Sequence, residues 1–399
     1  MPPQPDDMRM DLDAMRRLRR DIHAHPELGF EESRTSDIIA AELGQMGCDE
    51  VHRGMGRTGV VGVIRAGSSS RSIGLRADMD ALPIQEQNKF AHRSRLDGRM
   101  HACGHDGHTA MLLGAARHLA ATRNFDGQVN LVFQPAEEGL GGASSMLADG
   151  LFERFPCDAI YAMHNMTSLP LGRFSIRPGP MMAGGAFFDI AVHGQGAHGA
   201  KPHLGIDPVF VACQIVCALQ GIVSRNVDAT EAAVLSVTRI AGGDAYNVMP
   251  ASATIGGTVR AFNPATMALM ETSMRRIAQG VAEGFGARVD VDFRVQFAPL
   301  VNDGAEAAFM GDMAASIVGE DNVERDRALV MASEDFGFIL QACPGAFMFI
   351  GNAGPDGTGA SPVHTPTYDF NDEALPLGVA LFVRLAETRL AKCGQAGNR

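Results

Sequence analysis

One stretch of the chain, residues 183–297, follows a different pattern from everything around it. Its apolar runs predict the order strand, helix, strand, strand, helix, strand, and its first helix is expected over 207–225. Asp207 is suited to cap that helix, with Pro208 at the first helical position. This order is the split β-α-β arrangement of ferredoxin-like units. Because such a unit has its own core, the rest of the chain must fold around it.

Helical spacing and short β-branched runs alternate on either side of this insert. The expected helices cover 33–47, 108–121 and 304–318, and the expected strands cover 60–67, 72–80, 127–135, 157–165 and 345–351. Such alternation predicts an α/β layered domain with a mostly parallel sheet. We therefore predict a discontinuous α/β domain formed by 1–182 and 298–399, interrupted by an α+β ferredoxin-like (βαββαβ) domain over 183–297.

The charge balance argues against several classes of partner. The 399 residues carry a formal net charge of −12, whereas nucleic acids and anionic membranes are bound through basic surfaces. The largest basic run, at 16–20, is expected on a solvated helix face. The N-terminus lacks the apolar core of a signal peptide, and no run reaches the length of about 18 apolar residues that a membrane span needs. We expect neither a nucleic acid nor a membrane as partner.

The seven cysteines are scattered singly, without the spacing of a disulfide framework. Five of them lie among apolar neighbours, and we expect buried thiols at Cys48, Cys157, Cys213, Cys217 and Cys343. These features are typical of a protein kept in a reducing compartment. The sequence therefore predicts a cytoplasmic protein without disulfides.

The segment MHACGHDGHTA (100–110) concentrates groups that bind metals or protons. Three histidines, a cysteine and an aspartate fall between His101 and His108. In open α/β sheets, functional groups gather beyond the carboxyl ends of strands. Further candidates follow the expected strands, and these are Asp78, Asp80, Glu137, Glu138, His164 and His364. Each has an ordinary structural role when taken singly, but together they favour a metal site.

The chemistry of these side chains supports that interpretation. Imidazole, thiolate and carboxylate groups are the ligands of Zn²⁺ and similar ions. Five ligands are too many for one tetrahedral ion with an open water position, and they suit two ions that share a bridging ligand. Of the neighbours Glu137 and Glu138, one can bind metal while the other acts as general base. The alternative of Cys103 as a nucleophile leaves the carboxylate pair without a role.

Several motifs, in order along 11–392, resemble the aminoacylase/carboxypeptidase metallopeptidase family. They are HACGHDGHTAMLLGAA, QPAEEG, AMHN, GQGAHGAKPHLGIDPV, NVMP, GTVR, SEDF and VHTPTYDFND. Two more, DIHAHPELGFEE and LRADMDALP, resemble its amidohydrolase branch, which includes hippurate hydrolase and the indole-acetyl-amino-acid hydrolases. No single motif is specific, but their combination is.

The resemblance implies a site for two divalent ions of zinc, manganese, cobalt or nickel. The ligands that it implies are Cys103 as the bridge, with His105, Glu138, His164 and His364. It also implies Glu137 as general base and acid. Distant relatives have a histidine where this chain has Asp78, so Asp78 and Asp80 are expected to support the ligands rather than bind metal.

The resemblance also assigns roles within the insert. It implies that the insert forms a dimer contact, and that His198 reaches the partner's active site to help hold the oxyanion. The residues alone favour another interpretation, in which His198 is a turn residue beside Gly196 and Gly199. Asn247 and Arg260 are implied as the groups that receive the substrate carboxylate. A homodimer or homotetramer is the expected assembly.

The expected function is metal-dependent hydrolysis of a small-molecule N-acyl amino acid, such as hippurate, to a carboxylic acid and a free amino acid. A carboxypeptidase or dipeptidase using the same site is an alternative within enzymes. A non-catalytic protein that binds acyl-amino acids is an alternative from another class, and the intact Glu137–Glu138 pair argues against it. Met166 and Met249 depart from the family pattern and affect the shape expected for the acyl pocket.

Overall fold

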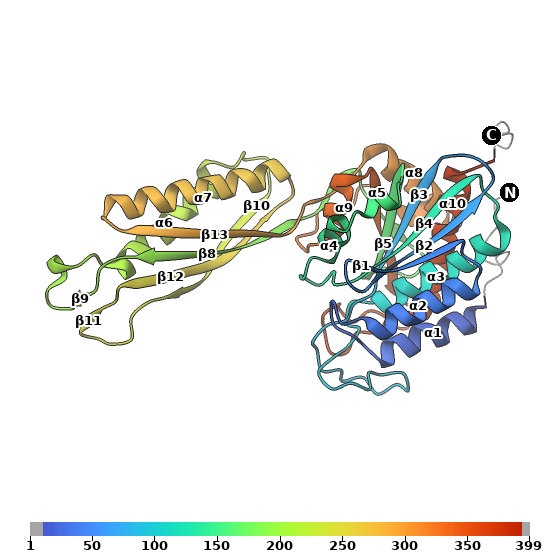
Figure 1. Ribbon diagram of the computed structural model, residues 1–399, viewed down its shortest axis with the longest axis horizontal. Coiled ribbons are helices and arrows are strands. Elements are labelled where there is room, and N and C mark those ends of the chain that lie inside the picture. Colours follow the sequence, from blue (N-terminus) through green and yellow to red (C-terminus); the bar gives the residue numbers. More distant parts are fainter. Residues whose placement is uncertain (1–10, 393–399) are drawn as a thin grey trace. The chain divides into compact units, whose positions relative to one another are not determined.

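The computed structural model describes residues 11–392, and the chain divides into two compact units (Figure 1). Unit 1 comprises the chain up to Gly179, 301–328 and the chain from Phe338, and unit 2 comprises 180–300 and 329–337. The predicted bounds of the insert, 183 and 297, lie three residues inside those of its main segment. The second segment was expected in the outer domain. It belongs to unit 2 because the Ala183 amide donates to the carbonyls of Val330 and Ala332.

Unit 1 is built on one eight-stranded sheet in the order β1-β2-β4-β3-β5-β16-β6-β15. Its strands are β1 (Glu50–Met55), β2 (Gly59–Ala66), β3 (Ser72–Asp78), β4 (Gly127–Gln134), β5 (Ala159–Pro170), β6 (Phe174–Ser175), β15 (Val323–Glu324) and β16 (Gly345–Ala353). The central strands β4, β3, β5 and β16 are parallel neighbours, whereas β1, β2 and β6 join through antiparallel pairs. The predicted α/β class is confirmed, and the parallel part forms the middle of the sheet.

Helices pack against this sheet and against one another. They are α1 (Leu12–Ala24), α2 (Ser33–Gln45), α3 (His105–Thr122), α4 (Gly142–Ala148), α5 (Leu151–Arg154), α8 (Gly304–Val318), α9 (Phe336–Ala342), α10 (Leu375–Arg389) and the 3-10 turns η3 (Glu320–Asn322) and η4 (Asp372–Ala374). The helix α3 is buried along most of its length, between α1, α10 and β3. It begins at His105, three residues before the predicted start, so His105 and His108 lie on the same turn.

One prediction for α1 holds for Arg17 and Arg20, which are exposed, but was wrong for Arg19. The basic run at 16–20 was expected on a solvated face, but Arg19 is fully buried. Its guanidinium binds three carboxylates, those of Asp106, Asp369 and Asp372, at 2.8–3.3 Å. A buried guanidinium is tolerated because these acids compensate its charge.

Unit 2 has the predicted β-α-β-β-α-β order. Its elements are β8 (Gly184–His193), α6 (Pro208–Arg225), β10 (Ala233–Ala241), β12 (Ser252–Ala261), α7 (Pro264–Gly284) and β13 (Arg288–Phe297), with shorter pieces β7 (Gly179–Met182), β9 (Ala197–His198), η2 (Pro202–Leu204) and β11 (Val248–Met249). The short strand β14 (Leu300–Asn302) begins at the last residue of the main segment of unit 2, and its other two residues belong to unit 1. The strands form an antiparallel sheet in the order β10-β12-β8-β13. Buried side chains of α6 and α7 pack on it and form a separate core.

The helix α6 meets one expectation and departs from two others. Asp207 caps it as predicted, by accepting from the amides of Val209 and Phe210. By length and apolar composition α6 alone among the helices of the described residues could cross a membrane, although no apolar run was expected to be long enough. A helix that covers a core can pass the same test, and α6 buries one face in the core of unit 2. Cys213 and Cys217 lie on its other face and are exposed, so the prediction of buried thiols was wrong for both.

Candidate metal centre

The predicted ligands of unit 1 follow the parallel strands. Asp78 ends β3, Glu137 and Glu138 follow β4, and His164 lies on β5. Parallel strands present their carboxyl ends at one edge of a sheet, and the loops there form sites. Cys103 comes just before α3, His105 is the first residue of that helix, and His364 lies in the loop between β16 and α10. The topology therefore brings distant segments of the chain together.

The ligand atoms of these residues lie within a few ångströms of one another. Those of Cys103, Glu138 and His364 all lie within 4.8 Å, and so do those of His105, Glu137 and Glu138. The Cys103 Sγ lies 3.3 Å from the Nε2 atom of His164. Glu138 belongs to both groups, so the five residues predicted as ligands form one cluster with Glu137 beside it.

Two buried atoms at the centre of this cluster indicate that a cation fits there. The Nε2 atom of His105 and the Oε1 atom of Glu138 are buried, and neither has a hydrogen-bond partner among the described residues. The His364 Nε2 lies 3.1 Å from that Oε1, close enough for an ion pair but without hydrogen-bond geometry. Buried polar atoms are normally paired. Ligand atoms that lie together without hydrogen bonds are instead arranged as metal ligands are.

The charges around His105 also indicate that a cation fits in this cluster. Burial disfavours a charged imidazole, but Asp78 and Asp80 outweigh it and raise the pKa of His105 to about 10. The Asp80 carboxylate lies 3.1 Å from the Nδ1 atom of His105 and also accepts from the amide of Glu138 at 3.0 Å. The acids around His105 thus favour positive charge at this point, and a divalent ion supplies it.

His164 and Cys103 differ in how they are prepared for binding. Burial and the neighbouring His108 hold the pKa of His164 well below its usual value, so the imidazole is neutral. Its Nδ1 lies 2.7 Å from the carbonyl oxygen of Asn165. A proton on Nδ1 leaves the lone pair of Nε2 available to bind a metal ion. Burial and the carboxylates of Glu138 and Glu137 raise the pKa of the Cys103 thiol well above its usual value. Cys103 must therefore lose a proton when it binds an ion.

His108 is a site residue for which the sequence suggested no role. Its Nδ1 lies 2.6 Å from Asp78, and its Nε2 accepts the amide proton of Asn165. Both nitrogens are therefore engaged, so His108 supports the cluster although it lies among Asp78, His105 and His164. Arg76 donates to the same Asp78 carboxylate at 2.7 Å. The spacing of three residues between His105 and His108, one helical turn, was the available signal.

The backbone before Glu137 adopts an unusual conformation. Ala136 has a φ of 50°, in the left-handed region that a residue with a Cβ atom rarely adopts. Its amide donates to Glu32 Oε1 at 2.8 Å, and its carbonyl accepts from Gly142. The chain therefore turns sharply after β4, immediately before Glu137 and Glu138. Local strain of this kind collects at functional sites.

The three predicted site residues of the insert all belong to unit 2. His198 pairs with Val248 in the β9–β11 ladder, and the amide of Gly199 donates to the carbonyl of Asn247. Both His198 and Asn247 are exposed. Arg260 lies near the other end of β12, so the structure does not bring it together with them.

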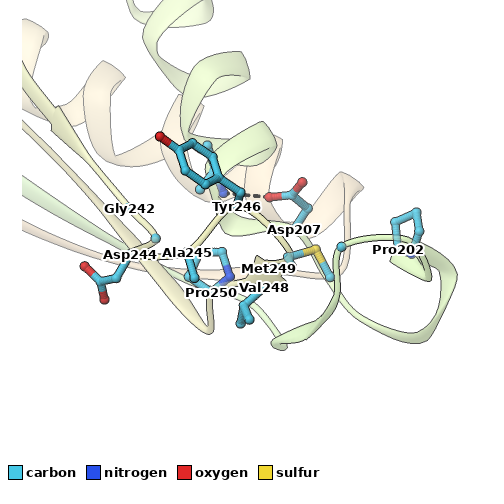
Figure 2. A pocket seen from close by; sticks show the side chains of 12 residues that line it. Pro202, Asp207, Gly242, Asp244, Ala245, Tyr246, Val248, Met249 and Pro250 are labelled. Carbon is cyan, nitrogen blue, oxygen red and sulfur yellow. Dashed lines mark hydrogen bonds between the residues drawn. The ribbon is translucent and has the colours of Figure 1, made fainter.

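A pocket of about 530 Å³ is lined by residues from 199–209 and 242–250, segments that adjoin His198 and contain Asn247 in the sequence (Figure 2). Tyr246, Val248, Met249, Pro202 and Asp207 are among the residues that line it. The Tyr246 side chain is fully exposed. The two loops that carry the predicted His198 and Asn247 therefore form a hollow, partly apolar surface.

The surroundings of Arg260 leave its guanidinium able to bind an anion. Its guanidinium donates to Ser333 and has no carboxylate partner among the described residues. Gly185 lies opposite Arg260 in the sheet, and a Cβ atom at Gly185 would collide with the guanidinium. Burial lowers the pKa of Arg260, as expected for a half-buried cation without an acid beside it. Ser333 was not predicted, although it is the first residue of the SEDF motif.

Known proteins resemble the chain over nearly its whole length. The model of peptidase family M20/M25/M40 matches residues 74–388. Hippurate hydrolase of Campylobacter jejuni is 41% identical over 370 residues, which are 93% of this chain and 95% of that protein. IAA-amino acid hydrolase ILR1-like 4 of Arabidopsis thaliana is 40% identical over 380 residues, 94% of this chain and 85% of that protein. The YxeP protein of Bacillus subtilis, a dinuclear metal binding peptidase, superposes with a TM-score of 0.81 at 34% identity, covering 95% of this chain and 98% of that one.

Proposed function

This chain belongs to peptidase family M20/M25/M40 and hydrolyses the amide bond of an N-acyl amino acid with divalent metal, and we propose that Glu137 is the general base of a dinuclear centre. The observation that carries this proposal is the single cluster of ligand atoms with Glu137 beside it. Cys103, which would help to hold the ions, lies near both Glu138 and His164. Zinc, manganese, cobalt and nickel all suit such a donor set.

The proposed reaction needs a base, a held carbonyl and a proton for the leaving group. When bound, two divalent ions at such a centre lower the pKa of water and polarise the amide carbonyl. Glu137 accepts a proton from the attacking water and delivers it to the amide nitrogen as the C–N bond breaks. The products are a carboxylic acid and a free amino acid. Asp80 holds both His105 and Glu138 in place during these steps.

The proposed substrate is an N-acyl amino acid of the hippurate type. This is the substrate named for the relative from Campylobacter jejuni. Its carboxylate is suited to Arg260, whose planar fork matches two oxygens and whose partner Ser333 is neutral.

We further propose that the active form is a homodimer, or a larger assembly built on it, with shared sites. Between Ser252 and Arg260, β12 extends by about 26 Å at roughly 3.3 Å per residue, and His198 and Asn247 lie beyond its first residue. One subunit therefore cannot place both His198 and Arg260 on one small substrate. A second copy that supplies His198 removes this conflict, and two-fold pairs are the commonest homo-oligomers.

The activity is tested with a panel of substrates and ions. The purified protein, freed of metal, is incubated with hippurate, other N-acyl amino acids and dipeptides, each with Zn²⁺, Mn²⁺, Co²⁺ or Ni²⁺. Release of glycine from hippurate is the expected result. Preference for dipeptides would favour the carboxypeptidase or dipeptidase alternative. No release of an amino acid under any of these conditions would contradict the proposed function.

A further inference from the structure

Asn165, the residue after His164 on β5, forms hydrogen bonds through both its side chain and its backbone. Its side chain is buried, with an exposed fraction of 1%. The side-chain Nδ2 donates to the carbonyl of Cys103 at 2.6 Å, and Oδ1 accepts from the hydroxyl of Tyr368 at 2.9 Å. The backbone amide donates to His108, as described above. Only an amide side chain offers a donor and an acceptor in this shape.

These bonds reach each of three segments that bear predicted ligands. The Cys103 carbonyl belongs to the loop that leads into α3. His164 is the neighbour of Asn165, and its ring is oriented by the Asn165 carbonyl. Tyr368 lies four residues after His364, in the same loop, and is itself fully buried. One side chain thus joins segments that lie more than 200 residues apart in the sequence, as Asn165 and Tyr368 do at a separation of 203.

Gly104 shows how tightly this junction is built. Its φ is 93°, in the left-handed region that favours glycine. A Cβ atom there would lie 2.3 Å from the Tyr368 hydroxyl and 2.4 Å from the Asn165 Nδ2. Glycine between the predicted ligands Cys103 and His105 is therefore required for Asn165 and Tyr368 to approach the loop.

Asp80 connects the remaining predicted ligands in a similar way. Its carboxylate contacts the ring of His105 and the backbone amide of Glu138. Asn165 therefore contacts the segments of Cys103, His164 and His364, whereas Asp80 contacts His105 and Glu138. The supporting role of Asp80 was predicted from the sequence, whereas no role was predicted for Asn165.

We propose that Asn165 is a positioning residue that fixes the segments of Cys103, His164 and His364 relative to one another, so that their donor atoms form one binding geometry. This inference rests on the proposed dinuclear centre. Asn165 itself touches no reacting atom. Its loss is therefore expected to weaken the ligand arrangement more than the fold. Removal of a group that orients a metal ligand typically lowers metal affinity by about 10- to 100-fold.

The experiment compares Asn165→Ala with Asn130→Ala. Asn130 is a fully buried asparagine on β4 that donates to the Pro156 carbonyl, and it forms no bond to the metal cluster. Metal affinity is measured by competition with a chelator, and the visible spectrum of the Co²⁺-loaded protein reports the thiolate and imidazole ligands. The urea midpoint of each metal-free protein reports the fold.

The expected result is a loss of affinity of about tenfold or more and a changed Co²⁺ spectrum in Asn165→Ala. Asn130→Ala should keep the affinity and spectrum of the unmodified protein, while both variants lose similar stability in the metal-free state. Tyr368→Phe, which removes one oxygen atom, should show a smaller change in the same direction. If Asn165→Ala does not fold, the metal affinity and Co²⁺ spectrum of Tyr368→Phe test the inference instead.

Two results would overturn the inference. One is unchanged affinity and spectrum in Asn165→Ala, or in Tyr368→Phe where only that variant folds. The other is a loss of metal accompanied by metal-free destabilisation far beyond that of Asn130→Ala, which would mean a merely structural role. Failure of the proposed function is distinguishable, because the unmodified protein would then bind no divalent ion or release no amino acid.

Discussion

The sulfur of Cys103 lies 3.3 Å from the Nε2 atom of His164, although 61 residues separate them in the sequence. Burial and nearby carboxylates raise the pKa of the thiol well above its usual value, and burial with His108 keeps the imidazole neutral. Without a cation, this pair is a neutral thiol beside a neutral ring. Cys103 would lose its proton on binding a divalent ion, because metal binding and proton release are coupled.

Metal removal should therefore abolish activity. Prolonged chelation is expected to remove the ions and all turnover of hippurate, and a divalent ion should restore both. The thermal unfolding midpoint should rise when metal returns, because ligands that bind only the folded state stabilise it. Elemental analysis alongside the activity assay checks this. Full activity in a protein that contains no divalent ion would refute the proposed mechanism.

The two neighbouring glutamates should respond differently to substitution. Glu137→Ala is expected to keep its metal and to lower kcat by about 10²–10⁴-fold, since it removes only the general base. Glu138→Ala should lose metal, because its carboxylate lies within both ligand groups. Metal content per subunit and kcat are measured on both. The assignment is wrong if metal falls in the first variant and holds in the second.

Arg260 should determine the affinity for the substrate carboxylate. Arg260→Ala is expected to raise KM for hippurate by about 10- to 100-fold, the usual effect of losing a charged hydrogen bond. Ser333→Ala should cause a smaller rise, because it removes only the bond that orients the guanidinium. Arg239→Ala is the control, since Arg239 lies on the same sheet but is paired with Asp189. Equal KM values in the Arg260 and Arg239 variants would count against this role.

Subunit mixing tests whether His198 acts in the partner's site. His198→Ala and Glu137→Ala subunits should each be inactive, and a hybrid dimer should contain one site with both groups intact. Activity of the hybrid is then expected to reach about half that of the unmodified dimer, because one site of two is repaired. Native mass spectrometry confirms the exchange. No recovery in confirmed hybrids would show that His198 acts within its own subunit or not at all.

His23 should make the stability of the protein depend on pH. Burial opposes its charge, but Asp106 and Glu86 outweigh burial and raise the pKa of His23 to about 9. The folded state therefore binds the proton more tightly than the unfolded state. The resulting stabilisation is complete below about pH 6.5 and is lost as the pH rises through about 9.

His23 alone should lower the free energy of unfolding between these pH values by an amount on the order of 3 kcal/mol. His105, whose pKa is raised to about 10, adds a fall of its own in the metal-free protein. His23→Gln should therefore remove only the part that comes from His23, while His52→Gln should keep the whole fall. Urea titrations of the metal-free proteins at several pH values measure the effect. Identical pH profiles for His23→Gln and the unmodified protein would exclude His23 as the source.

Local patterns were sufficient to predict the α/β class and the β-α-β-β-α-β order of the insert, because both depend on periodicity and on short-range turn signals. The burial of Arg19 could not be predicted in this way. Two of its three partners, Asp369 and Asp372, lie 350 residues or more away in the sequence. Cys213 and Cys217 were assigned to the core because their neighbours are apolar, yet the helical period turns both outward.

The candidate site was predicted more completely for ligands than for the residues that hold them. A ligand is recognisable by its type and by its place after a strand. Asn165 and His108 act through bonds to the backbone or to other side chains, and these bonds exist only once β5, α3 and the late loop meet. Ser333 belongs to unit 2 although the segment 329–337 lies well beyond the rest of that unit in sequence.

The length of β12 has a consequence for how the protein behaves on dilution. If the strand separates His198 from Arg260 within each subunit, a monomer carries every group needed for catalysis and yet has no complete site. The turnover number measured per subunit is then itself a function of protein concentration, and it falls steeply below the dissociation constant of the pair. The amount of enzyme in a cell would set how active each molecule is, as well as how many molecules there are.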